Sequence, residues 1–160
     1  MGKVYVIYGQ GKGKTTAAIG RGIKAMSEGE DVSIIQFLKS ATEVELLDIL
    51  KRLEPEMKVF RFEKFNGNFD ELTDEKKKEE SLNITNGLNF AKKVITTGGS
   101  GFVILDEVLG LVDIGYIGID KLIELINDRP DDVDILLTGT AFFEELRPYV
   151  DIITRIEEDK

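Results

Sequence analysis

The sequence predicts a three-layer α/β fold, in which a mostly parallel β-sheet is covered by helices on both faces. Short apolar runs alternate with segments of helical periodicity along the whole chain. Two of the runs, Phe102–Leu105 and Ile135–Thr138, are almost continuously apolar. Such runs are typical of parallel strands that are buried on both sides. The repeated order of strand and helix therefore favours a doubly covered sheet.

The expected strands are rich in β-branched and aromatic residues and end at glycine, proline or charged residues. They cover Val4–Tyr8, Val32–Phe37, Val59–Phe62, Phe102–Leu105, Ile135–Thr138 and Ile152–Ile156.

The expected helices have apolar residues at helical spacing. They cover Thr15–Glu28, Thr42–Leu53, Asp74–Thr97, Ile119–Asn127 and Ala141–Tyr149. Thr42 and Glu45 have the spacing of a capping box. In the long third helix, five residues are expected to face the core: Leu82, Leu88, Ala91, Val94 and Ile95. The segment Lys64–Leu72 is expected to be a loop.

Length and composition narrow the possible chemistry. The 160 residues, of which 42% are hydrophobic, suit a single domain over residues 1–160. The absence of cysteine excludes disulfides, cysteine–zinc sites and thiol catalysis. The absence of histidine excludes Ser-His and Cys-His chemistry and imidazole proton transfer. Any chemistry must use carboxylates, Lys, Arg, hydroxyls, backbone N–H groups and a bound cofactor or ion.

The net charge of −9 argues against a nucleic-acid partner. Against this acidic background, a basic cluster near the start of the chain stands out: Lys3, Lys12, Lys14, Arg21 and Lys24. No segment is long and apolar enough for a membrane span, and the first apolar run lacks the pattern of a signal peptide. We therefore expect a cytoplasmic protein without a membrane partner.

A glycine-rich segment between the first strand and the first helix has the pattern of a P-loop. Its glycines allow several N–H groups to point at one anion, and the helix N-terminus adds positive charge. Lys14 supplies a cation for phosphates, and Thr15 offers a hydroxyl to Mg²⁺. The pattern departs from the strict motif at Tyr8, which stands where a glycine is usual.

We expect this segment to bind ATP with Mg²⁺, which makes the predicted fold a P-loop NTPase (RecA-like) domain. The alternative is a glycine-rich turn with a solvated pair of lysines. The expected nucleotide-binding residues here are Gly9, Gln10, Gly11, Lys12, Gly13, Lys14, Thr15 and Thr16.

Acidic and polar residues follow other strands at the same predicted edge of the sheet. Asp106 comes directly after a buried strand, and ligands bind beyond the carboxyl ends of parallel strands. Asp106 and Thr15 are therefore the expected Mg²⁺ ligands, and Glu107 is expected to orient a water, hold a ribose or support the metal. Gln36 and Lys39 are candidate nucleotide contacts. The alternatives are an acidic turn and polar residues that simply leave a strand.

Several segments together resemble a known family. In chain order they are Gly9–Ala18, Val32–Lys39, Val103–Glu107, Asn127–Pro130 and Leu137–Gly139. They look like the P-loop ATP:corrinoid adenosyltransferases, also called cob(I)yrinic acid a,c-diamide or cob(I)alamin adenosyltransferases. The resemblance runs from about Val4 to Ile156.

The resemblance implies a transferase in which the cobalt of a reduced corrinoid, such as cobalamin or a precursor, attacks the 5′ carbon of ATP and triphosphate leaves. It implies that Lys14 and Glu107 are catalytic, and that Lys24 stands near the nucleotide. It also implies a homodimer, with a reductase such as a flavodoxin as a candidate partner. The family's tryptophan-containing segment, associated with the corrinoid, is absent, since the chain has no tryptophan.

Two other functions use the same P-loop. A P-loop ATPase or nucleotide kinase would transfer a phosphoryl group and release ADP. A noncatalytic ATP-binding module would bind the nucleotide without turnover.

Overall fold

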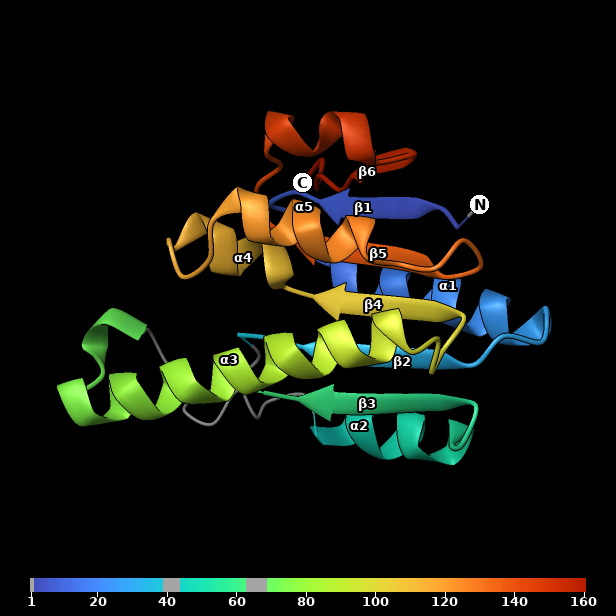
Figure 1. Cartoon of the computed structure of the whole chain (residues 1–160), viewed down its shortest axis with the longest axis horizontal. Helices are drawn as coiled ribbons and strands as arrows, with labels where there is room; N and C mark the ends of the chain where they lie inside the picture. The colour runs from blue at the N-terminus through green and yellow to red at the C-terminus, as the bar shows by residue number, and fades with distance from the viewer. Residues whose placement is uncertain (1, 39–43, 63–68) are drawn as a thin grey trace.

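In the part of the chain that the structure describes, six strands form one sheet, and each pair of neighbouring strands is parallel (Figure 1). The protein's computed structural model describes residues 2–38, 44–62 and 69–160. The strands are β1 (Val4–Tyr8), β2 (Val32–Gln36), β3 (Met57–Arg61), β4 (Phe102–Asp106), β5 (Asp134–Gly139) and β6 (Ile152–Arg155). Their order across the sheet is β3-β2-β4-β5-β1-β6.

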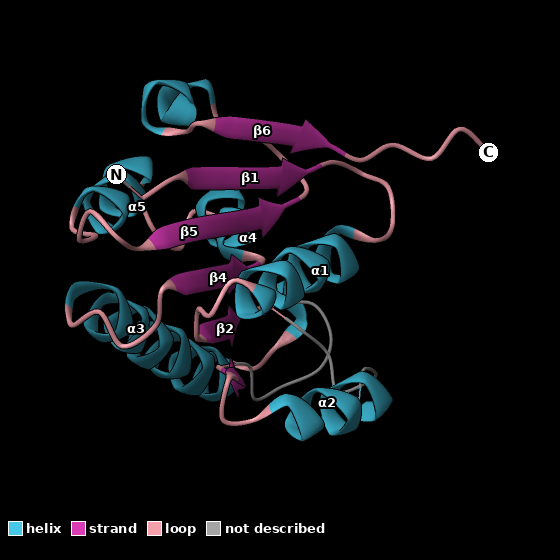
Figure 2. Cartoon of the chain, turned by 90° about the vertical axis from the view of Figure 1, so that its right-hand side faces the viewer, coloured by secondary structure: helices cyan, strands magenta, loops and turns pink. Residues whose placement is uncertain are grey.

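Helices cover both faces of this sheet, which Figure 2 shows after a turn of 90° from Figure 1. One face carries α1 (Lys14–Ser27) and α2 (Val44–Leu50). The other face carries α3 (Asp74–Thr96), α4 (Val108–Asp113) and α5 (Ile119–Asn127). The arrangement confirms the predicted three-layer, RecA-like α/β fold.

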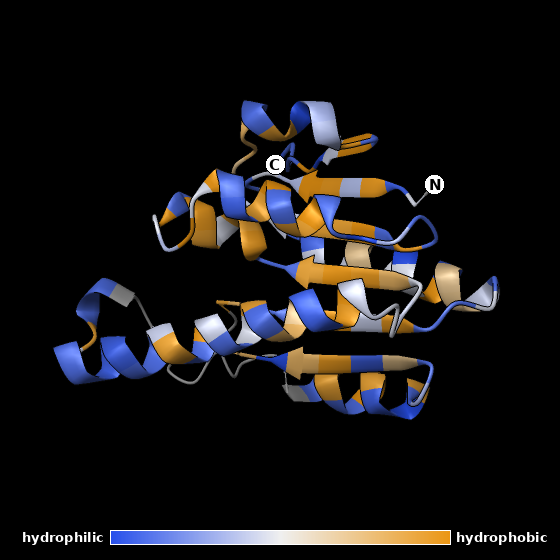
Figure 3. Ribbon diagram, in the orientation of Figure 1, coloured by the Kyte–Doolittle hydropathy of each residue, from blue (hydrophilic) through white to orange (hydrophobic). Residues whose placement is uncertain are grey.

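The alternation of side chains along each strand divides the core into two layers. In β4, Val103 and Leu105 belong to the layer under α3, α4 and α5, whereas Phe102 and Ile104 belong to the layer under α1. In Figure 3 the strands are mostly coloured as hydrophobic, while the covering helices are mixed. The same alternation continues past the apolar residues, so Asp106 at the end of β4 faces the side of α1.

The chain leaves two neighbouring strands on opposite faces. After β1 it enters α1 on one face of the sheet. After β5 it passes through a 3₁₀ helix, η4 (Glu144–Tyr149), whose Leu146 packs in the layer of α5 on the other face. The segments that follow the carboxyl ends of β1 and β5 therefore diverge, and ligands bind at such points in open parallel sheets.

The predicted strands and long helices are found within a few residues of their expected ends, but two short segments differ. The expected helix over Ala141–Tyr149 is wrong at its start and in its type, because only η4 forms there. Pro148 lies inside η4, and proline lacks the N–H that an α-helical turn needs. The short helix α4 was not expected, since its one turn and a half carries too little periodicity to be recognised.

The expected core face of α3 is partly wrong. Ala91 and Ile95 are buried, and Leu88 and Val94 pack against the core, but Leu82 is 63% exposed. Figure 1 shows why: the first turns of α3 extend past the ends of the strands, so no sheet lies under them.

Parts of two expected elements lie outside the described residues. Thr42, the expected helix cap, is among them, as is most of the loop expected over Lys64–Leu72. The described end of that loop contains a 3₁₀ helix, η3 (Phe69–Glu71). The expected Thr42–Leu53 helix is found as α2, followed by the 3₁₀ helix η2 (Lys51–Leu53).

Among the described helices, none has the length and apolar character that crossing a bilayer requires.

Arg129, which follows α5, donates to the carbonyl oxygen of Ile126 at 2.9 Å and to that of Gly2 at 2.9 Å. Arg129 therefore caps the C-terminal end of α5 and links this helix to the segment before β1 by hydrogen bonds.

Two helical glycines give a direct test of the packing. A Cβ on Gly87 of α3 would lie 2.7 Å from Phe62 and 2.8 Å from Phe37, whereas a Cβ on Gly20 of α1 would meet nothing within 4 Å. We expect Gly87→Ala to lower the free energy of unfolding by about 1–3 kcal/mol through overpacking. Gly20→Ala should raise it by about 0.5–1 kcal/mol, because alanine favours the helix. Urea unfolding measures both, and equal stability of the two variants would contradict the described packing of α3.

Candidate functional site

The glycine-rich loop lies between the end of β1 and the start of α1. Gly13 immediately precedes the helix with φ of 100°, a conformation that side chains other than glycine rarely adopt. Its carbonyl oxygen accepts the first helical hydrogen bond, from the N–H of Ala17 at 2.8 Å. A Cβ on Gly13 would meet nothing within 4 Å, so backbone conformation rather than crowding requires glycine here.

The N-terminus of α1 lacks the negative charge that helices usually place there. The first turns of α3 and α5 contain acidic residues, and Thr73 caps α3 by accepting from the N–H of Lys76. The first turn of α1 contains no acidic residue, and its first residue is the cation Lys14. Its first N–H groups have no partner within the helix, and the helix dipole adds positive charge. This combination is suited to binding an anion.

Lys14 folds back over the loop. Its Nζ donates to the carbonyl oxygen of Gly11 at 2.9 Å. The side chain is thus held where a phosphate bound by the loop would lie. The contacts described for Lys14 include no ion pair, so none has to be broken before its ammonium contacts a phosphate. This position is consistent with the predicted role of Lys14 as a cation for phosphates.

A fully buried carboxylate joins α1 to three strands. Asp106 is 0% exposed, and both of its oxygens accept from the hydroxyl of Thr15 at 3.1 Å. Its Oδ1 also accepts from the hydroxyl of Thr138 at 2.7 Å, and its Oδ2 accepts from Nε2 of Gln36 at 3.1 Å. Gln36, Asp106 and Thr138 lie at the ends of β2, β4 and β5. Each continues the alternation that faces α1, so the sheet itself brings them together.

Glu107 occupies a strained position directly after this carboxylate. Its φ of 64° lies in the left-handed region, which is uncommon for residues other than glycine. The Thr138 hydroxyl stabilises this turn by accepting from the N–H of Glu107 at 2.8 Å. Strained residues cluster at functional sites, so the geometry is consistent with the predicted role of Glu107.

The residues around Asp106 have the chemistry that Mg²⁺ prefers. Mg²⁺ is usually held by one or two protein oxygens together with waters and substrate phosphates, rather than by a cage of carboxylates. Thr15 and Asp106 offer a hydroxyl and a carboxylate beside the expected phosphate site. Oε1 of the buried Gln36 has no hydrogen-bond partner among the described residues, which leaves an additional acceptor beside them. These residues fit the ion, and elsewhere the described residues hold no group of three or more acidic side chains placed to bind a metal ion.

The structure therefore brings together most of the residues predicted for the site, while their roles stay predictions. The residues gathered around the loop and its buried carboxylate are Gly9, Gln10, Gly11, Lys12, Gly13, Lys14, Thr15, Thr16, Gln36, Asp106 and Glu107. Lys39 lies outside the described residues. Thr138 joins Asp106 to Glu107. The sequence places Thr138 at the same edge, after a buried strand, and leaves open whether it serves the site or belongs to a strand-to-helix turn.

Lys24 is not brought to the loop. It lies in the last turn of α1, at the other end of the helix from Lys14, and its ammonium pairs with Glu28 at 2.7 Å. The hydrogen bond and the charge of Glu28 raise the pKa of Lys24. The expectation that Lys24 stands near the nucleotide thus gains no support from the position of this lysine in the fold.

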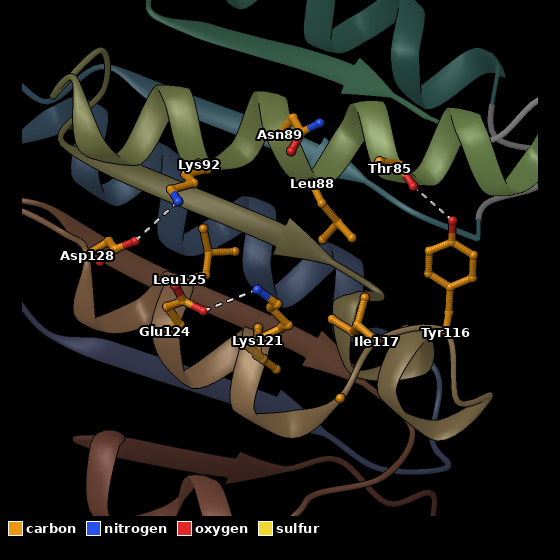
Figure 4. A pocket seen from close by; sticks show the side chains of 12 residues that line it. Thr85, Leu88, Asn89, Lys92, Tyr116, Ile117, Lys121, Glu124, Leu125 and Asp128 are labelled. Atoms are coloured by element: carbon orange, nitrogen blue, oxygen red, sulfur yellow. Dashed lines mark hydrogen bonds and ion pairs between the residues drawn. The ribbon is translucent and has the colours of Figure 1, made fainter.

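A groove of about 500 Å³ lies elsewhere, between α3 and α5 on the face away from α1 (Figure 4). Its floor is apolar, with Leu88, Leu122 and Leu125. Lys92 of α3 reaches Asp128 after α5 at 3.9 Å across it. None of the residues that surround Asp106 lines this groove, so the groove is separate from the P-loop.

Comparison with known proteins gives a consistent result. Residues 1–160 match the model of the family described as ATP:corrinoid adenosyltransferase BtuR/CobO/CobP. The chain is 24% identical over 159 residues to the corrinoid adenosyltransferase of Escherichia coli (strain K12), covering 99% of this chain and 78% of that protein. It is 24% identical over 163 residues to the corrinoid adenosyltransferase CobA of Salmonella typhimurium (strain LT2), with the same coverage of 99% and 78%.

The network around Asp106 predicts a stability effect that can be measured without any ligand. Thr138→Val keeps the shape of the side chain but removes the donor to Asp106 and the acceptor for the N–H of Glu107. We expect the free energy of unfolding to fall by about 1–3 kcal/mol, since buried polar groups lose their partners. Thr140→Val, at an exposed position two residues later, should change it by no more than about 0.5 kcal/mol. A Thr138→Val variant as stable as Thr140→Val would argue against the network.

Proposed function

This chain belongs to the ATP:corrinoid adenosyltransferase family and is an enzyme of this type, and we propose that it transfers the 5′-deoxyadenosyl group of ATP to the cobalt of a reduced corrinoid. In this reaction the cobalt supplies the electron pair that forms the bond to the 5′ carbon. The bond between that carbon and the triphosphate oxygen breaks, and inorganic triphosphate leaves with its electrons.

The proposal is carried by the start of α1, which combines an acid-free helix N-terminus with the Lys14 ammonium. In adenosyl transfer the nucleophile is the metal of the substrate, so the protein needs no histidine or cysteine base. Its contribution is to position the reactants and to stabilise the charge that develops on the leaving polyphosphate. The charge at the start of α1 suits this task.

We assign the following roles to the residues of the site. The N–H groups of the loop and Lys14 bind the triphosphate, and Lys14 neutralises the charge that grows on it as the bond breaks. Thr15 and Asp106 would hold Mg²⁺, which supplies further positive charge to the phosphates when it is bound. Gln36 and Thr138 hold the Asp106 carboxylate in place, and Glu107 stands at the adjacent turn.

The identity of the phosphate product tests the proposal. The protein is mixed with ATP, Mg²⁺ and chemically reduced cobalamin, the corrinoid spectrum is followed, and the phosphate products are separated. We expect an alkylated corrinoid and inorganic triphosphate in equal amounts. Release of ADP instead would favour the alternative of a P-loop ATPase or kinase, and binding without turnover would favour an ATP-binding module.

The role of Lys14 can be tested by binding alone. We expect Lys14→Ala to weaken the binding of inorganic triphosphate by about 10- to 100-fold, because a charge-assisted hydrogen bond is lost. Isothermal titration calorimetry measures this directly. Lys121→Ala removes an exposed lysine of α5 on the other face of the sheet and should leave the affinity unchanged. Equal affinities of the two variants would refute the assignment of the P-loop.

A further inference from the structure

The chain beyond β6 lies against the first half of the P-loop. The N–H of Ile156 donates to the carbonyl oxygen of Tyr8 at 2.8 Å, and the carbonyl oxygen of Ile156 accepts from the N–H of Gly11 at 3.2 Å. These bonds continue the pairing of β1 with β6 beyond the end of β6. A Cβ on Gly9 would lie 2.1 Å from the Ile156 carbonyl oxygen, so this close approach requires glycine.

Two residues further on, an acidic side chain reaches the same loop. Oε1 of Glu158 accepts from the backbone N–H of Lys12 at 3.2 Å. Lys12 lies between Gly11 and Gly13, and the backbone N–H groups of a P-loop are its phosphate-binding groups. A carboxylate oxygen therefore takes one of the donors that the loop would offer to a phosphate oxygen.

The contacts of Ile156 and Glu158 differ in how easily they can be replaced. The Ile156 contact is made by the backbone and is fixed by the strand that precedes it. The Glu158 contact is a single hydrogen bond of an exposed side chain, and such charged contacts contribute little stability. A polyphosphate with several negative oxygens can displace Glu158, whereas Ile156 stays as part of the sheet.

The neighbouring acidic residues do not make this contact. Glu157 pairs with Arg155 at the end of β6, and Asp159 is exposed. The direction of the extended chain after β6 thus selects Glu158 as the residue that reaches the loop.

We propose that Glu158 is an internal competitor for the P-loop, whose carboxylate occupies the N–H of Lys12 until a polyphosphate displaces it. This inference rests on the proposed function, in which the loop binds the triphosphate of ATP. The competition lowers the apparent affinity for the nucleotide and for the triphosphate product. By linkage, binding of either one releases Glu158 from the loop.

The test compares two variants that remove the same charge from adjacent exposed positions. Glu158→Gln and Asp159→Asn are titrated with inorganic triphosphate beside the wild type, at low ionic strength. We expect Glu158→Gln to lower Kd by about two- to fivefold, the range of an exposed charged contact. Asp159→Asn should stay close to the wild type. The difference should shrink at high salt, because screening weakens the competing contact.

The outcomes separate this inference from the proposed function. If wild type binds triphosphate, Lys14→Ala does not, and Glu158→Gln binds like Asp159→Asn, the P-loop assignment stands and the competition is overturned. Weaker binding by Glu158→Gln also overturns it, since the carboxylate would then support the loop rather than compete for it. If wild type binds no more tightly than Lys14→Ala, both the proposed function and the competition fail.

Discussion

The site depends on one buried carboxylate and the hydrogen bonds that satisfy it. A charged group that is taken out of water is costly unless it is paired or hydrogen-bonded. Asp106 accepts from donors on α1, β2 and β5, so each of these elements is held to the end of β4. The second of these elements, β2, and the third, β5, flank β4 in the sheet. Loss of a donor would therefore disturb the position of the carboxylate as well as the stability of the fold.

The same part of the fold shows how an acidic protein concentrates positive charge at the start of one helix. The net charge of the chain is −9, yet the first turn of α1 holds no acidic residue and begins with Lys14. The buried carboxylate of Asp106 lies beside this turn and accepts from the Thr15 hydroxyl, and we propose that a metal ion bound there joins it to phosphates. Among the described residues, Glu158 reaches the loop from outside. Its contact with the loop is weaker than the buried contacts of Asp106 because it is made at the surface.

Individual residues show how far the sequence could go. The P-loop was predictable because Gly13, Lys14 and Thr15 follow a strand and open a helix, and local backbone geometry alone accounts for that pattern. Asp106 was predictable as a strand-end residue of the same edge. For Thr138 the sequence left a site role and a plain turn both open, because its importance depends on β5 lying next to β4, and no local pattern indicates which strand lies beside another. The core assignment of Leu82 failed for a related reason, since helical spacing does not reveal where the sheet under α3 ends.

The sequence by itself determined the alternation of strands and helices, the glycine-rich loop and the family to which the chain belongs, because each of these depends on short local patterns and on their order along the chain. Only the tertiary structure decided which strands are neighbours, and hence that Gln36, Asp106 and Thr138 meet under α1. It also decided that Glu158 comes back to Lys12. These contacts join residues that are distant along the chain, and they arise from packing and register rather than from local propensity.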